Sequence, residues 1–145
     1  MKNILFLCTG NSARSIMAEG YMNKAANSWR AFSAGSQPTG TPNPLALETL
    51  SHHGIDMKAP RSKSWDEFAA DDAPIMNTIV TVCDNAAGET CPIWPQKNGR
   101  APKVLHWSFP DPAAATGSEA MKREAFEKVF EDIRLRIDKF LATQK

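Results

Sequence analysis

A cysteine and an arginine near the N-terminus have the spacing of an oxyanion-binding loop. Cys8 follows a short apolar run, and Arg14 stands six residues later, where a helical pattern begins. Gly10 permits a tight loop in which successive backbone N–H groups point inward at the start of a helix. Such a loop would favour the nucleophilic thiolate form of Cys8, and the Arg14 guanidinium would hold two oxygens of a tetrahedral anion. The expected oxyanion-binding residues are Thr9, Gly10, Asn11, Ser12, Ala13 and Arg14.

Four further residues could complete the chemistry. Ser15 could donate a hydrogen bond to the Cys8 sulfur and ease its departure as a leaving group. Asp111 lies between two prolines that would hold its loop rigidly, and an ordinary turn aspartate is the alternative to a catalytic role on local sequence. Cys83 and Cys91 bring the cysteine count to three, and an odd count favours reactive thiols over the disulfide framework of a secreted protein.

A zinc site is an alternative use of these cysteines, together with the three histidines at positions 52, 53 and 106. Neither a Cys-x2-Cys nor a His-x3-His spacing occurs, however. We therefore expect no bound metal.

Apolar periodicity predicts an α/β chain in which strands alternate with helices. The expected strands span residues 4–7, 29–34, 77–82 and 104–107, and the expected helices span residues 13–26, 44–52 and 118–141, with a short helix after residue 64. Asn43 is expected to cap the second helix, and Ser64 and Glu67 are expected to form a capping box. The alternation predicts a four-stranded parallel sheet flanked by helices, in a single domain over residues 1–145.

This sheet would position the reactive residues. Cys8 and Cys83 each follow a strand, and the third strand should lie beside the first, so Cys83 is expected to emerge near the oxyanion-binding loop. Residues 84–102, with three prolines and two glycines, are expected to form a long loop. The last helix is expected to bury the stripe Met121, Phe126, Val129, Phe130, Ile133, Ile137 and Phe140.

The overall composition excludes several classes of partner. With 17 basic and 16 acidic residues, the chain has no basic stripe that would indicate a nucleic-acid partner. No apolar run approaches the ~18 residues of a membrane span, and the five apolar residues after position 3 are too few for a signal peptide. We therefore expect a cytoplasmic protein without membrane or nucleic-acid partners.

Cys8-Thr9-Gly10-Asn11-Ser12-Ala13-Arg14-Ser15 resembles the Cys-x5-Arg-Ser signature of low-molecular-weight protein tyrosine phosphatases. The resemblance covers the whole chain, since Ser33-Ala34-Gly35 and the late Asp111-Pro112 pair also match. It implies that family's fold with an N-terminal P-loop, Cys8 as the nucleophile and Asp111 as the general acid.

Two further segments resemble the thioredoxin-coupled arsenate reductases of this family. Residues 82–95, which contain Cys83 and Cys91, look like their redox loop, and residues 106–113 are similar to their general-acid segment. The resemblance implies that arsenate is reduced to arsenite, with phosphate or sulfate as analogues and no bound cofactor. Cys83 would attack Cys8, Cys91 would attack Cys83, and thioredoxin would reduce the resulting disulfide.

A phosphatase acting on phosphomonoesters through Cys8, Arg14 and Asp111 is the alternative. Tyrosine phosphatases typically place a tyrosine after the Asp-Pro pair, whereas this chain has Ala113 and Ala114 there, which favours the reductase. A third hypothesis, an oxyanion-binding module without catalysis, has no need of a general acid.

Some relatives bind a monovalent cation behind the P-loop through residues that correspond to Asn11, Glu19 and Ser33 and a carboxylate. The carboxylate position corresponds to Lys63 here. We expect the lysine ammonium to replace the cation and to hold Asn11 by direct hydrogen bonds, so that no potassium is required.

Overall fold

The computed structural model describes residues 2–57, 60–69, 73–82 and 102–143. Four parallel strands form one sheet in the spatial order β2-β1-β3-β4, as the sequence predicts. The strands are β1 (Lys2–Leu7), β2 (Trp29–Ala34), β3 (Thr78–Thr81) and β4 (Lys103–His106). The helices are α1 (Arg14–Ala25), α2 (Pro44–His52), α3 (Asp66–Ala69) and α4 (Glu119–Ala142), with a short 3-10 turn, η2 (Pro112–Ala114).

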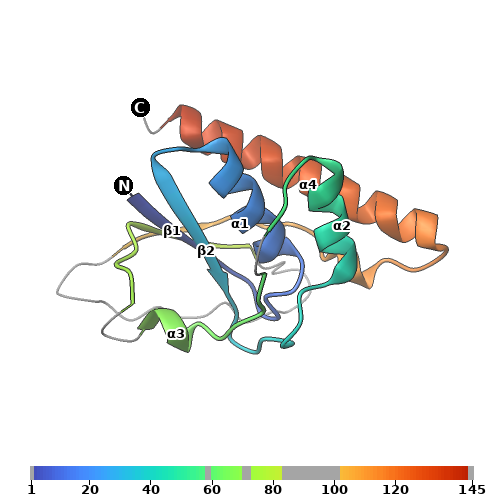
Figure 1. The fold of residues 1–145 in the computed structure, drawn as a ribbon, viewed down its shortest axis with the longest axis horizontal. Coiled ribbons are helices and arrows are strands. Elements are labelled where there is room, and N and C mark those ends of the chain that lie inside the picture. Colours follow the sequence, from blue (N-terminus) through green and yellow to red (C-terminus); the bar gives the residue numbers. More distant parts are fainter. Residues whose placement is uncertain (1, 58–59, 70–72, 83–101, 144–145) are drawn as a thin grey trace.

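Helices cover both faces of the sheet (Figure 1). On one face, α1 packs against β1, α2 and α4 pack against α1, and their buried side chains form the larger core together with Ile4 and Phe6. On the other face, Leu5 and Leu7 contact a smaller cluster that includes Phe68 of α3. The alternation along β1 follows from the period of two in a strand, and it buries both faces of the central strand.

The register places the ends of β1 and β3 side by side. Leu7 of β1 pairs with Thr81 of β3, and the Val82 N–H donates to the Leu7 carbonyl at 2.8 Å. This confirms the predicted neighbourhood of the first and third strands. Cys83, the residue after Val82, lies outside the described residues, as does Cys91.

The long C-terminal helix buries six of the seven predicted side chains; Met121 is the exception, being 57% exposed. Met121 lies in the first turn of α4, where its side chain covers Gly117: a Cβ built on that glycine would be 2.8 Å from the sulfur. The prediction was wrong at this position because the Met121 side chain packs on the preceding turn and not in the core.

Helix capping agrees with the sequence at α2 and only partly at α3. The Asn43 side chain accepts from the Leu45 N–H at 2.9 Å, and Pro44 occupies the first helical position. Ser64 accepts from the Asp66 N–H at 3.2 Å, but the Glu67 carboxylate accepts from the two terminal nitrogens, Nη1 and Nη2, of Arg61. The predicted capping box is therefore wrong in its glutamate half.

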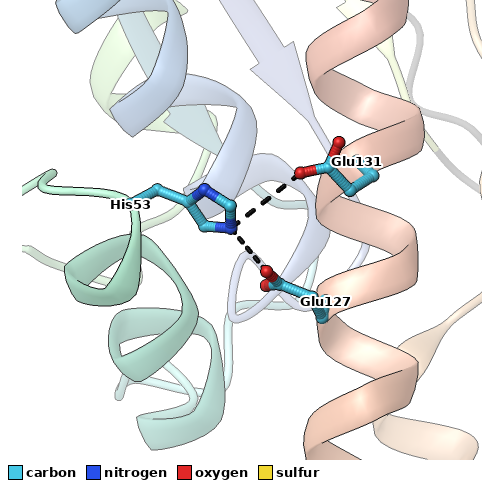
Figure 2. A group of neighbouring side chains, drawn as sticks. All are labelled: His53, Glu127 and Glu131. Carbon is cyan, nitrogen blue, oxygen red and sulfur yellow. Dashed lines mark hydrogen bonds and ion pairs between the residues drawn. The ribbon is translucent and has the colours of Figure 1, made fainter.

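Contacts between helices complete the layer that contains α1, α2 and α4. His53, which follows α2, hydrogen-bonds to Glu127 of α4 at 2.6 Å (Figure 2).

Among the helices that the structure describes, none has an apolar stretch long enough to cross a bilayer.

Candidate functional site

The oxyanion loop, residues 8–14, connects the end of β1 to the start of α1. Cys8 is buried, and its N–H donates to the Ala34 carbonyl at 3.1 Å, which continues the pairing of β1 with β2. Asn11, with φ of 46°, takes the left-handed conformation, which asparagine tolerates better than most residues. Gly10 was expected to permit the tight loop, but the residue with positive φ is Asn11.

Three carbonyl groups of the loop point toward neighbouring backbone. They accept hydrogen bonds from the segment after β2: Thr9 from Gln37 N–H (2.9 Å), Gly10 from Thr39 N–H (3.0 Å) and Ser12 from Asn43 N–H (2.8 Å). In a trans peptide the following N–H points opposite to the carbonyl, so the N–H groups of Gly10, Asn11 and Ala13 turn toward the other side of the loop. This arrangement can hold an anion at the positive end of α1, whose N-cap, Ala13, has no polar side chain.

Arg14 joins the oxyanion loop to the segment that carries Asp111. Its side chain is 3% exposed, and Nη1 donates to the Phe109 carbonyl at 3.1 Å. Asp111, two residues further on, is exposed and accepts from the Ala113 N–H at 3.0 Å, which caps η2. The loop and the expected general-acid segment therefore meet, although they are about a hundred residues apart in the sequence.

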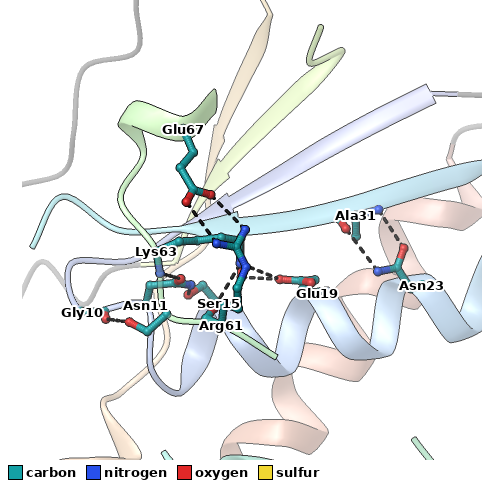
Figure 3. A network of polar contacts seen from close by, with 11 residues as sticks. Gly10, Asn11, Ser15, Glu19, Asn23, Ala31, Arg61, Lys63 and Glu67 are labelled. Atoms are coloured by element: carbon teal, nitrogen blue, oxygen red, sulfur yellow. Dashed lines mark hydrogen bonds and ion pairs between the residues drawn. The ribbon is translucent and has the colours of Figure 1, made fainter. Parts of the chain in front are cut away.

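Asn11 and Ser15 support the loop from behind (Figure 3). The Asn11 side chain is fully buried; its amide donates to Ser15 Oγ at 2.8 Å, and its oxygen accepts from the Lys63 N–H at 2.8 Å. These bonds fix the left-handed residue at the turn of the loop. The hydrogen bond expected from Ser15 to the Cys8 sulfur stays a prediction.

The structure brings Lys63, Glu19 and Ser33 together behind Asn11. The buried Lys63 ammonium lies 3.7 Å from Glu19 Oε1 and donates to the Arg61 carbonyl at 3.1 Å, while the Ser33 hydroxyl donates to the same Glu19 oxygen. The expected direct bond from the ammonium to Asn11 was wrong, because the backbone N–H of Lys63 makes that contact.

Burial acts on both charges of this pair. Loss of hydration raises the pKa of Glu19, and the Lys63 ammonium offsets part of that shift. Loss of hydration likewise lowers the pKa of Lys63, and the Glu19 carboxylate offsets part of that shift. Because an ammonium already faces the carboxylate, a second cation here would meet like charge.

We expect any catalysis at this site to be equally fast in potassium and in sodium at matched ionic strength. The Lys63 ammonium supplies the positive charge that a bound monovalent cation would otherwise bring to Glu19. Steady-state rates in the two chloride salts provide the measurement. A clear stimulation by potassium over sodium would refute this role of Lys63.

At Thr9 and Gly35 the structure shows surroundings that the sequence did not predict. The Thr9 hydroxyl oxygen is buried and has no hydrogen-bond partner among the described residues. Gly35 lies against the loop backbone, so that a Cβ there would be 2.4 Å from the Thr9 carbonyl oxygen and 2.6 Å from that of Cys8. Only the three-dimensional packing reveals the burial of the Thr9 hydroxyl and the close approach of Gly35, because neither depends on a local spacing.

Comparisons with known proteins give the family of the chain. The sequence model described as low molecular weight phosphotyrosine protein phosphatase matches residues 3–145. A protein of Halalkalibacterium halodurans named arsenate reductase is 39% identical over 145 residues, which cover 99% of this chain and 98% of that protein.

Solved structures of two arsenate reductases are similar as well. That from Archaeoglobus fulgidus is 29% identical, with a TM-score of 0.69, over 93% of this chain and 98% of that one. A thioredoxin-dependent arsenate reductase from Corynebacterium glutamicum is 26% identical, with a TM-score of 0.64, over 99% of this chain and 64% of that one.

Proposed function

Because the chain belongs to the low molecular weight phosphotyrosine protein phosphatase family, we propose that it reduces arsenate to arsenite through a relay of Cys8, Cys83 and Cys91. The observation that carries the proposal is that neighbouring backbone engages the carbonyls of Thr9, Gly10 and Ser12, beside the buried Cys8 and at an N-terminus of α1 without a side-chain cap. The 39% identical relative from Halalkalibacterium halodurans, named arsenate reductase, supports this substrate.

The first step forms a bond between Cys8 and arsenic. Arsenate binds against the loop N–H groups and Arg14, in the place that phosphate or sulfate would occupy as analogues. The Cys8 thiolate attacks arsenic(V), and Asp111 protonates a departing oxygen, which leaves as water. Arg14 aligns the bound arsenate with Asp111, because its hydrogen bond to the Phe109 carbonyl holds the segment that carries Asp111 next to the loop.

The next steps move two electrons to arsenic. The Cys83 thiolate attacks the Cys8 sulfur, the sulfur–arsenic bond breaks with its electron pair on arsenic, and arsenite leaves. Cys91 then attacks Cys83, which frees the Cys8 thiolate and leaves a Cys83–Cys91 disulfide. The adjacent ends of β1 and β3 support the attack of Cys83 on Cys8. Leu7 and Val82, the residues that precede these two cysteines, are joined by a backbone hydrogen bond.

The surroundings of Asp111 favour a small inorganic substrate. Ala113 and Ala114, in η2, offer no aromatic ring on which a phosphotyrosine could stack. Tyr21, the sole tyrosine in the sequence, is engaged elsewhere: its hydroxyl donates to Asp138 of α4 at 2.6 Å, and burial first, then Asp138, raise its pKa to about 12. Hydrolysis of phosphomonoesters remains the second candidate, because the family match and the shared first step favour it.

We propose thioredoxin as the final reductant, on the strength of the thioredoxin-dependent relative from Corynebacterium glutamicum. The test is a coupled assay with thioredoxin, thioredoxin reductase and NADPH. Arsenate-dependent NADPH consumption is expected in the wild type and should vanish in Cys83→Ser and Cys91→Ser. NADPH consumption that persists in Cys83→Ser would contradict the relay. If the protein instead hydrolysed phosphate esters at the same rate without Cys83 and Cys91, and did not reduce arsenate, the phosphatase would be favoured.

A further inference from the structure

The contact between α2 and α4 gathers three side chains that can ligate a metal, apart from the oxyanion loop. His53 caps the C-terminus of α2, and Glu127 and Glu131 lie one turn apart on α4. One ligand atom from each lies within 4.8 Å of the other two, and Figure 2 shows both carboxylates directed at the imidazole.

The distances suit a small ion after minor side-chain rotation. His53 Nε2 is 2.6 Å from Glu127 Oε1 and 4.0 Å from Glu131 Oε1. Ligands about 2.0–2.2 Å from a tetrahedral zinc ion lie roughly 3.3–3.6 Å from one another, between these two values. The three side chains are 28%, 45% and 37% exposed, so an ion can enter and the carboxylates can adjust.

Neighbouring contacts hold the imidazole in place. The His53 ring stacks on Phe130, with centroids 4.3 Å apart and an interplanar angle of 27°. The His53 N–H donates to the Leu50 carbonyl at 3.0 Å, and the Lys24 ammonium donates to the His53 carbonyl at 3.2 Å. The backbone bonds hold residue 53 at the end of α2, and the stacking on Phe130 limits rotation of the imidazole that carries Nε2.

The second oxygen of Glu131 is also engaged. Arg134 binds Oε2, which leaves Oε1 as the atom nearer to His53. The guanidinium therefore orients the carboxylate, and its positive charge offsets part of the attraction between the two carboxylates and a cation.

We propose that His53, Glu127 and Glu131 bind a divalent transition-metal ion of the zinc type and thereby link α2 to α4. One imidazole and two carboxylates match the ligands of such ions, whereas magnesium and calcium prefer oxygen ligands alone. A water molecule completes the coordination. The site is independent of the proposed reductase activity, and its ligands are too far apart in the sequence for a spacing motif to reveal them.

The test is a titration of the full-length protein with zinc chloride, followed by NMR of the histidine ring nitrogens and backbone amides. This readout separates binding at His53 from any binding at the cysteines, because thiolates in general are zinc ligands. We expect zinc to shift the His53 Nε2 signal and the amides near residues 127–131. Glu127→Gln and Glu131→Gln should each weaken this response at least about tenfold.

Two matched variants serve as controls. Glu124→Gln removes an exposed carboxylate from the same helix, and His52→Ala removes the neighbouring histidine; both should leave the His53 response unchanged. A His53 signal that does not move at excess zinc would overturn the proposal. So would an equal weakening in Glu124→Gln and Glu127→Gln, since general attraction by the acidic surface would then explain the binding.

Discussion

Replacing Cys8 with serine is expected to abolish arsenate reduction, with kcat/KM lowered at least about 10⁴-fold. The hydroxyl is a poor nucleophile, and it cannot form the disulfide that carries the electrons away. Coupled-assay turnover with arsenate provides the measurement. The buried position of Cys8 at the end of β1 makes the isosteric serine the least disruptive replacement.

Anion binding should survive in the same variant. The loop N–H groups and Arg14 do not depend on the sulfur, so the Kd for arsenate, measured by calorimetry, should change only a few-fold. Loss of binding together with turnover would mean that the loop had collapsed. Turnover retained without the Cys8 sulfur would contradict its role as the nucleophile.

Gly35→Ala is expected to reduce turnover about 10²-fold or more and to lower the free energy of unfolding by about 1–3 kcal/mol. The new Cβ would lie 2.4 Å from the Thr9 carbonyl oxygen and 2.6 Å from that of Cys8. Both are backbone atoms of the oxyanion loop, so the loop itself must move. Steady-state kinetics and denaturant unfolding measure the two effects.

Gly20→Ala is the matched control for this substitution. Its Cβ would approach the Leu50 and Met57 side chains at 3.1–3.3 Å, and these flexible side chains can shift. Alanine also favours a helix interior over glycine by about 1 kcal/mol, which offsets the crowding. If Gly35→Ala were as active and stable as Gly20→Ala, the close packing of residue 35 against the loop would not matter for catalysis.

Much of the fold could be predicted from the sequence, because the signals are local. The apolar run before Cys8 gives β1, Asn43 and Pro44 give the start of α2, and the 3.6-residue period gives most of the buried face of α4. In each case neighbouring residues alone determine the pattern. Met121 is the exception to the helical pattern of buried residues, because its side chain packs on the turn at Gly117.

The site could be predicted in its composition and less well in its geometry. The spacing at the strand–helix junction gave Cys8 and Arg14, and the family resemblance gave the grouping of Lys63 with Glu19. It did not give the left-handed conformation of Asn11 or the backbone bond from Lys63, because the protein positions both through contacts between distant segments. The approach of His53 to Glu127 likewise depends on the packing of α2 against α4.

Disulfide mapping after a single turnover tests the thiol relay most directly. Reduced protein is mixed with arsenate without thioredoxin, alkylated, digested and examined by mass spectrometry. A Cys83–Cys91 disulfide is predicted in the wild type, and a Cys8–Cys83 disulfide in Cys91→Ser. Arsenite release with all three cysteines recovered as free, alkylated thiols would contradict the account. So would a Cys8–Cys91 disulfide in the wild type.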